Sequence, residues 1–273
     1  MTASPPEPRA QARRYGDAFA DVYDAWYAGC GSDARNDATP PGADVAGVVA
    51  LARRFPSGDV LELGAGTGRL TLPLARAVAP RRVAALDAST AMLDRLRTKL
   101  ATGATSDDAP GNVDVVVGDM SDDHAVPHGP FSLVVVSYNT LFNLPDEAAQ
   151  RRCLATVAGR LTVDGACVID CFVPVDDPAP LGVSIDRRNG VRVVTATFTD
   201  PVRRLVSGVT EEHRESGTVL RPWHVAYAPP ELLDDMARSA GLHLAQRNGG
   251  WDGEQFDDSS ARHVSLYVRA RTS

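Results

Sequence analysis

The residues of this chain best placed to do chemistry are a short run of glycines preceded by an acid. Glu62 is followed by Gly64-Ala65-Gly66-Thr67-Gly68, and a helical pattern begins directly after this loop. Such an arrangement brings a ligand against bare backbone N–H groups at the positive end of a helix. Glycine is needed because a Cβ atom would block the approach of the ligand to the backbone.

The spacing of the glycines excludes two common nucleotide-binding loops. The dinucleotide fingerprint needs a glycine three residues after Gly66, and Arg69 stands there instead. A Walker loop needs a lysine, and Lys99, the only lysine of the chain, lies far beyond the loop. A glycine loop alone is a weak signal, so its ligand must be inferred from residues elsewhere in the chain.

Short apolar runs alternate with helical patterns through the middle of the chain. Strands are expected at 59–63, 82–86, 113–117, 131–136 and 166–172. Helices are expected near 43–55, 67–79, 89–101 and 146–161. This alternation predicts parallel strands joined by right-handed crossovers, in a doubly wound α/β sheet that is covered on both faces.

The pattern changes in the last third of the chain. Between residues 183 and 227 there is no helical period, and Asn189-Gly190 predicts a type I′ hairpin turn because both residues accept positive φ. Ser216-Gly217 predicts a second turn, so we expect a small antiparallel sheet inserted into the α/β domain. The alternation then resumes with a helix at 230–240 and strands near 242–247 and 263–269.

Aromatic side chains are concentrated near the N-terminus, at Tyr15, Phe19, Tyr23, Trp26 and Tyr27. Their steps of three and four predict one amphipathic helix, which Gly29-Cys30-Gly31 would end. Residues 1 to 12 are rich in proline and alanine, a composition that predicts a disordered tail.

Further polar residues follow the glycine loop at the ends of the expected strands. Asp87 ends the second strand, Asp119-Met120 follows the third and Ser137 follows the fourth. With Glu62 and the glycines, these residues resemble the class I S-adenosylmethionine-dependent methyltransferases. The resemblance extends over about residues 15–270.

The resemblance implies S-adenosyl-L-methionine as the cofactor and no obligatory metal. In the family, the acid at the position of Asp87 accepts both ribose hydroxyls, and the residues at Ala88 and Met92 flank the adenine. Asp119 falls where the adenine amino group is recognised. The cofactor-binding residues implied are Tyr23, Glu62, Gly64, Ala65, Gly66, Arg69, Asp87, Ala88, Met92, Asp119, Met120 and Ser137. Taken singly, the two aspartates would equally cap a helix or close a loop, and Met92 would equally belong to the core.

The N-terminal aromatic segment resembles the one that closes over the cofactor in bacterial sugar N,N-dimethyltransferases. There, two tyrosines eight residues apart face the methyl donor and the substrate, which implies these roles for Tyr15 and Tyr23. A plain amphipathic helix packed on the core is the alternative, and it accounts for Phe19 and Trp26. Asn143 stands where those enzymes often carry a histidine, which argues against an amino-sugar substrate.

The candidate catalytic residues are Tyr15, Asn139 and His224. Asn139 lies after the fourth strand, where enzymes that methylate the amines of bases or of glutamine carry Asn/Asp-Pro-Pro-aromatic, a motif that this chain lacks. His224, on the inserted sheet, is a candidate general base, although an acidic nucleophile or a neutral amine needs none. The Pro-Cys pair of cytosine C5 enzymes is also absent, and Cys171 is more simply a buried thiol.

The composition argues against several partners. The 28 basic and 35 acidic residues give a formal net charge of −7, which disfavours nucleic acid because that binding needs basic side chains at the phosphates. No apolar run approaches the length of a membrane span, and the N-terminus has no apolar export segment, which predicts a cytoplasmic protein. The four cysteines form no CxxC pair and are expected to be reduced thiols.

Four further features together resemble actinobacterial methyltransferases of natural-product and antibiotic biosynthesis: the loop Tyr138–Asn143, the strand Trp223–Tyr227, Trp251 and the closing segment His263–Tyr267. We therefore expect in-line transfer of a methyl group to an oxygen, nitrogen or carbon nucleophile of a small molecule. The resemblance also implies a homodimer through the inserted sheet. Two alternatives stay open: a protein of this fold that binds the cofactor without methylating, for instance in cyclisation, and a nucleotide-dependent oxidoreductase.

The fold expected is thus α/β: a doubly wound, seven-stranded Rossmann-like methyltransferase sheet with an inserted antiparallel β lid and an N-terminal helical cap. Its expected parts are a disordered tail (1–12), the helical cap (13–57), an S-adenosylmethionine-binding core (58–172), the β lid (173–228) and the C-terminal part of the core (229–273). The lid residues match no pattern that is diagnostic of one substrate.

Overall fold

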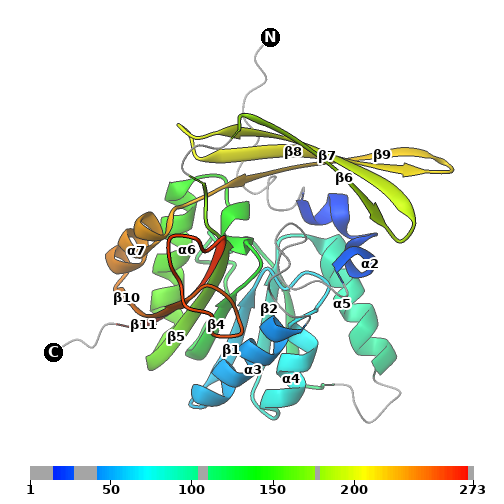
Figure 1. The fold of residues 1–273 in the computed structure, drawn as a ribbon. Helices are drawn as coiled ribbons and strands as arrows, with labels where there is room; N and C mark the ends of the chain where they lie inside the picture. The colour runs from blue at the N-terminus through cyan, green and yellow to red at the C-terminus, as the bar shows by residue number, and fades with distance from the viewer. Residues whose placement is uncertain (1–14, 28–41, 104–109, 176–178, 270–273) are drawn as a thin grey trace.

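The computed structural model of the chain describes residues 15–27, 42–103, 110–175 and 179–269. The expected tail and Gly29-Cys30-Gly31 therefore lie outside the described residues. Figure 1 shows a large sheet flanked by helices, with a smaller sheet laid across one end of it. Within the part of the chain that is described, no helix is both long and apolar enough to cross a membrane.

The large sheet contains seven strands in the spatial order β10-β11-β5-β4-β1-β2-β3. Five of them are parallel: β1 (Asp59–Leu63), β2 (Val83–Asp87), β3 (Val113–Val117), β4 (Phe131–Val136) and β5 (Leu161–Phe172). At one edge, β11 (Arg262–Arg269) lies antiparallel to both β5 and β10 (Leu242–Asn248). The predicted doubly wound α/β fold is confirmed, and the strand order reverses between β1 and β4, where such sheets open a crevice for a ligand.

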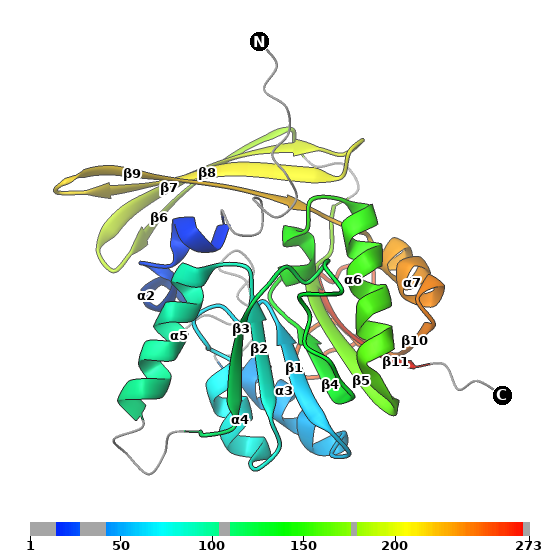
Figure 2. The same cartoon turned by 180° about the vertical axis from the view of Figure 1, so that it is seen from behind.

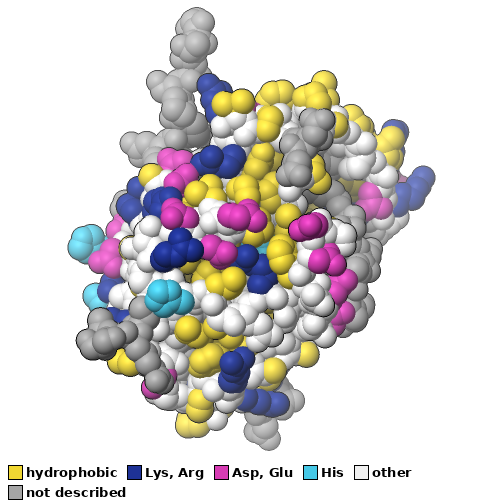
Figure 3. Space-filling view, turned by 60° about the vertical axis from the view of Figure 1, so that its left-hand side comes forward, with side chains coloured by type: hydrophobic (Ala, Val, Ile, Leu, Met, Phe, Trp, Pro, Cys, Tyr) yellow, Lys and Arg dark blue, Asp and Glu magenta, His cyan; other side chains and the backbone are white. Residues whose placement is uncertain are grey.

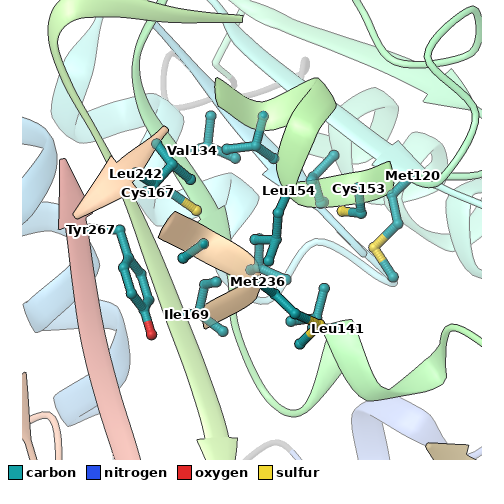
Figure 4. Close-up of a cluster of buried hydrophobic side chains, with 14 of the residues drawn as sticks. Met120, Val134, Leu141, Cys153, Leu154, Cys167, Ile169, Met236, Leu242 and Tyr267 are labelled. Atoms are coloured by element: carbon teal, nitrogen blue, oxygen red, sulfur yellow. The ribbon is translucent and has the colours of Figure 1, made fainter. Parts of the chain in front are cut away.

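Helices cover both faces of this sheet (Figure 2). One face carries α3 (Ala43–Arg54), α4 (Thr71–Val78) and α5 (Thr90–Gly103); the other carries α6 (Glu147–Arg160) and α7 (Pro230–Ser239). Successive strand residues alternate between these faces. Figure 4 shows the face under α6 and α7, where Leu154 and Met236 pack against Ile169 of β5. Because both faces are buried, the strands read as continuous apolar runs.

The smaller sheet is antiparallel, as the turn signals predict. Its strands are adjacent in chain order: β6 (Leu181–Arg188), β7 (Val191–Asp200), β8 (Leu205–Arg214) and β9 (Gly217–Ala226). Asn189 and Gly190 have φ of 51° and 79°, which is the left-handed pair that a type I′ turn requires. We call this sheet the lid.

The N-terminal aromatic segment differs from the single helix that its periodicity predicts. Residues 15–19 are helical, 20–22 form a turn, and α2 (Tyr23–Tyr27) follows. In a continuous helix the N–H of Val22 would donate to the carbonyl of Ala18. Here it donates to Phe19 at 3.1 Å, because Arg221 of the lid donates to the Ala18 carbonyl instead. A contact from a distant strand therefore interrupts the helix.

Candidate functional site

A cavity of about 210 Å³ lies beneath the lid, at the carboxyl ends of β1, β2, β3 and β4. Its walls come from the N-terminal aromatic segment, the glycine loop, the loops after β2 and β3, the loop after β4 and the inner face of the lid. The predicted site residues that line it are Tyr15, Tyr23, Gly64, Gly66, Asp87, Ala88, Met92, Asp119, Met120 and Asn139. Segments far apart in the sequence thus meet around one space.

The glycine loop is folded so that one of its glycines leaves room for a ligand. Gly64, with φ of 77°, packs so closely on Thr140 that any Cβ would collide with the threonine side chain. Gly66 also has a positive φ, of 54°, but a Cβ built there meets nothing within 4 Å. Gly64 is therefore needed for packing, whereas Gly66 exposes bare backbone to the cavity.

Asp87 joins the glycine loop to α5. Its Oδ2 accepts a hydrogen bond of 2.9 Å from the N–H of Gly66, and its Oδ1 accepts one of 2.8 Å from the N–H of Ser89. Burial raises the pKa of this carboxyl above its ordinary value, an effect that the backbone hydrogen bonds oppose. Asp87 therefore both fixes the start of α5 and faces the cavity, so the helix-capping role and a ligand-binding role do not compete.

Glu62 lies behind the loop, outside the cavity lining. It is buried, and its Oε2 accepts a 2.6 Å hydrogen bond from the Thr71 hydroxyl. Burial raises the pKa of this carboxyl to about 7, because the charged form loses its hydration. A cation placed in the cavity would favour the charged form.

Three other predicted residues also support the wall from outside the lining. Ala65 is buried within the loop. Arg69 pairs with the buried Asp44 and stacks over the Tyr138 ring, with its guanidinium carbon 5.7 Å from the ring centroid. Ser137 is buried and donates to Asp170 at 3.0 Å. These contacts hold neighbouring segments in place.

The loop after β3 forms a tight polar turn beside the cavity. The Asp119 Oδ1 accepts hydrogen bonds of 2.8 Å from both the N–H and the hydroxyl of Ser121. Met120 is buried beneath it. Met92 of α5 is also buried, packing with Phe19 and Trp26, so it belongs to a core cluster and to the cavity wall at once.

Four tyrosines converge on the cavity: Tyr15, Tyr23, Tyr27 and Tyr138. Tyr23 and Tyr27 have ring centroids 4.8 Å apart, and Tyr27 meets Tyr138 edge to face at 5.5 Å. Burial raises the pKa of both Tyr15 and Tyr23, so these phenols are neutral at ordinary pH. Their rings form an aromatic wall with hydroxyl groups on it.

The aromatic segment is fastened to the lid by a cluster of charges that the sequence did not reveal. Buried Arg221 donates to both carboxylate oxygens of Asp21, at 2.6 and 2.9 Å, and to Glu212 at 2.6 Å. Arg214 bonds the same two acids, at 3.0 and 2.7 Å. We call Asp21, Glu212, Arg214 and Arg221 the lid cluster. The one feature of the sequence that could have indicated this cluster is Arg221, a charged residue within an otherwise apolar strand pattern.

The same segment is fastened to the glycine loop on its other side. The Asp24 Oδ1 accepts a 2.6 Å hydrogen bond from the Thr67 hydroxyl and a 2.7 Å bond from the Lys99 ammonium. Lys99 also donates to the Thr67 carbonyl at 2.8 Å. The aromatic segment therefore spans from the lid to the glycine loop.

The loop after β4 is held by the end of β5. Asp170 is buried and accepts hydrogen bonds of 3.0 Å from both the Ser137 hydroxyl and the Trp251 indole, and it pairs with Arg262. Its carbonyl accepts a 2.9 Å bond from the N–H of Asn139. Sequence reasoning missed Asp170, which looks like any acid inside an apolar strand.

The structure does not bring His224 to the cavity. On either side of it in β9, Trp223 and Val225 line the space, whereas His224 is not among the lining residues. Successive side chains of a strand point to opposite faces, so His224 belongs to the outer face of the lid. Cys171 is buried, as predicted, and burial raises the pKa of its thiol well above the ordinary value.

Known proteins match the chain along most of its length. A family model described as a methyltransferase domain matches residues 60–165. The cypemycin N-terminal methyltransferase of a Streptomyces species is 29% identical over 241 residues, covering 84% of this chain and 90% of the relative. The structure of the CcbJ methyltransferase from Streptomyces caelestis is 30% identical with a TM-score of 0.81, covering 95% of this chain and 99% of the other.

A more distant structure shares the fold with its cofactor in place. It is an amino pentose methyltransferase from Micromonospora echinaspora with S-adenosylmethionine bound, involved in calicheamicin biosynthesis. It is 20% identical with a TM-score of 0.66, and the match covers 91% of this chain and 97% of the other. At this identity the likeness concerns the fold alone.

Proposed function

Since this chain belongs to the S-adenosylmethionine-dependent methyltransferases, we propose that it methylates an amine nitrogen of a small molecule in natural-product biosynthesis. The observation that carries the proposal is the lining of the cavity. Aromatic rings and neutral hydroxyl and amide groups dominate it, and none of the described lining residues is a histidine or a lysine. The charged residues of the lining are Arg188, which carries no free base, and the carboxylates Asp87 and Asp119, which we assign to the cofactor. On this assignment the nucleophile reacts without a general base.

A neutral amine meets this condition, because its lone pair is available without prior loss of a proton. Most hydroxyl and carbon nucleophiles need a base to take the proton. The nitrogen gains positive charge as the methyl group is transferred, and aromatic faces stabilise a cation at short range. One of the proteins above supports the choice by name, since it is an N-terminal methyltransferase.

The residues around the glycine loop fit the cofactor. The space over Gly66 admits a ligand against the bare backbone of the glycine loop, and the Asp87 carboxylate faces the same cavity. We propose that Asp87 binds the ribose hydroxyls, that Asp119 recognises the adenine amino group, and that Ala88 and Met92 flank the ring. When bound, S-adenosylmethionine supplies an activated methyl group; the chain supplies orientation and exclusion of water.

On the substrate side we propose roles for Tyr15, Tyr23 and Asn139. The two tyrosines are neutral, half-buried donors on the aromatic wall, able to orient the nucleophile by hydrogen bonds. His224 has no part in this proposal, because its strand position directs it away from the cavity. The alternative that the chain only binds the cofactor has no support from the comparisons.

We also propose that the lid forms a homodimer contact. Its outer face carries exposed apolar side chains, with exposed fractions of 72% for Val183, 64% for Ile185 and 59% for Leu220. Figure 3 shows hydrophobic side chains gathered along the top of the molecule, where the lid lies. Apolar patches of this kind mark interfaces. Ile185→Arg should convert a dimer to a monomer in light scattering, whereas an unmodified protein that is already monomeric would contradict the contact.

The proposed activity is tested by incubating the protein with labelled S-adenosylmethionine and a panel of small amines and shape-matched alcohols. The expected result is S-adenosylhomocysteine together with an N-methylated product from one or more amines. Products from alcohols alone would overturn the assignment to nitrogen while leaving the family activity intact. Asp87→Ala serves as the control that separates enzymatic from uncatalysed transfer.

A further inference from the structure

Two consecutive residues after β4 adopt a left-handed backbone conformation. Tyr138 has φ of 59° and Asn139 has φ of 60°. This conformation is unfavourable for residues other than glycine, although asparagine tolerates it better than most. Hydrogen bonds from the end of β5 hold it: the N–H of Asn139 donates to the Asp170 carbonyl at 2.9 Å, and the N–H of Phe172 donates to the Asn139 Oδ1 at 2.7 Å. Backbone strain of this kind collects at functional sites.

The bond from Phe172 decides which end of the Asn139 amide faces the cavity. A backbone N–H only donates, so the side-chain atom opposite it must be the oxygen. The NH₂ group is then directed away from β5. Asn139 lines the cavity, and among the described residues its Nδ2 has no hydrogen-bond partner. The wall therefore presents a fixed donor, while the acceptor oxygen is turned toward the backbone of β5.

A fixed donor cannot accept a hydrogen bond from the N–H groups of a substrate amine. It can bind an acceptor oxygen on the same substrate. In the enzymes that carry Asn/Asp-Pro-Pro-aromatic after the fourth strand, the side chain at this position accepts a hydrogen bond from the substrate amine. The Asn139 amide has the reverse orientation, with its donor toward the cavity.

The described lining has no histidine or lysine, and its two aspartates are assigned to the cofactor, which points to the same substrate chemistry. A simple alkyl amine, like that of lysine, has a pKa of about 10.4 and is almost entirely protonated near neutral pH. An amine on the carbon next to a carbonyl has a pKa of about 8, because the carbonyl withdraws electrons, and its neutral form is far more abundant. A carbonyl group would thus accept the hydrogen bond from Asn139, and it would also lower the pKa of the neighbouring amine, so that more of the amine is in the neutral, nucleophilic form.

We propose that Asn139 binds the carbonyl oxygen of an α-amino carbonyl substrate, such as an amino-acid amide, ester or peptide N-terminus. This inference rests on the proposed N-methylation. Asn139 acts here as a specificity-determining residue: its donor selects the oxygen, and the same contact orients the neighbouring nitrogen. No proton passes through it.

Asn139→Asp tests this role with little disturbance of the loop. Aspartate retains an oxygen for the N–H of Phe172 and tolerates a positive φ, but it replaces the donor by an acceptor. Asn143→Asp is the matched control, since Asn143 also lines the cavity and gains the same charge without touching the Phe172 bond. The probes are alaninamide and 2-amino-3-methylbutane, in which methyl groups replace the two polar atoms of the amide.

We expect the wild type to prefer alaninamide, and Asn139→Asp to lower kcat/KM for alaninamide by about 10- to 100-fold. The value for 2-amino-3-methylbutane should change little, and comparing variant with wild type on each amine cancels the difference between the amine pKa values. Asn143→Asp should affect both amines alike. Calorimetric titration of alaninamide into the protein saturated with S-adenosylhomocysteine should show the same loss of affinity without turnover.

Different failures have different meanings. If Asn139→Asp lowers the rates for both amines equally, or if the wild type binds both amines equally well, the carbonyl contact is wrong and the N-methylation proposal stands. If neither amine is methylated or bound while an alcohol is methylated, the proposal of an amine substrate fails, and this inference fails with it.

Discussion

The cavity has two walls that are built in different ways. The wall formed by the glycine loop and the ends of β1 and β2 rests on apolar side chains such as Leu63 and Leu86, each about 1% exposed. The opposite wall, formed by the aromatic segment and the lid, is joined by the charged residues of the lid cluster. Burial of apolar surface is insensitive to direction, whereas ion pairs require each partner in place. The first wall is therefore a rigid support and the second is an assembly of separable parts.

Two buried glutamates show this difference at the level of single groups. Glu62, on the glycine-loop side, has a pKa raised to about 7 because burial dominates. Burial acts on Glu212 in the same direction, but hydrogen bonds from Arg214 and Arg221 outweigh it and lower the pKa of Glu212. The glycine-loop wall therefore accommodates Glu62 in its neutral form, whereas the lid wall depends on the charged form of Glu212.

The largest expected effect comes from breaking the lid cluster. Arg221→Met leaves Glu212 buried beside Asp21 with only Arg214 to pair them, and should lower the free energy of unfolding by about 3 to 5 kcal/mol. Hydrogen exchange should show loss of protection in residues 15–27 and in the lid before the large sheet. Arg238→Met, which alters an exposed surface pair, is the control and should change stability by less than about 0.5 kcal/mol. If the two variants show equal hydrogen-exchange protection in residues 15–27 and in the lid, the aromatic segment and the lid are not separable from the large sheet.

The next effect concerns Glu62 and pH. Its pKa is about 7 in the folded chain against an ordinary value of 4.5, so the folded protein holds this proton more tightly than the unfolded one. Its contribution to stability is therefore full below about pH 4.5 and is lost as the pH rises through about 7, a change on the order of 3 kcal/mol. Denaturant titrations of wild type and Glu62→Gln should diverge over this window. Parallel curves would mean that burial does not perturb this acid.

A smaller effect is expected from Asp87→Asn. The substitution removes a charge but keeps one acceptor oxygen, so the dissociation constant for S-adenosylhomocysteine should rise about 10- to 100-fold in calorimetry. Asp114→Asn, on the exposed side of β3, is the matched control. Unchanged affinity would refute the proposed ribose contact and leave Asp87 as a helix cap alone.

The smallest effect is expected from Tyr15→Phe. The ring keeps its stacking on Phe19, with centroids 4.7 Å apart, and only the hydroxyl is lost. We expect turnover to fall by about 10-fold with little change in cofactor affinity, because one neutral hydrogen bond near the nucleophile is removed. If turnover is unchanged, Tyr15 serves packing only.

The same division explains what could be predicted from the sequence. The strands at 59–63 and 131–136 have the predicted bounds, because a doubly buried strand and a glycine loop are encoded by neighbouring residues. The edge strand at 113–117 also has the predicted bounds, since its run of valines is local as well. The break in the aromatic segment could not be predicted, since it depends on Arg221 about 200 residues away. His224 was a reasonable candidate by residue type, but which face of its strand is turned toward the cavity depends on the tertiary structure. The donor direction of Asn139 depends likewise on Phe172.

Lys99 gives this molecule a built-in reporter. It is the only lysine of the chain, and its ammonium links Asp24 of the aromatic segment to the Thr67 carbonyl of the glycine loop. Incorporation of lysine labelled with carbon-13 at Cε would therefore give one lysine side-chain resonance and would leave all the N–H donors of the ammonium in place. Its chemical shift would record directly whether the two walls are closed on each other, with no mutation introduced.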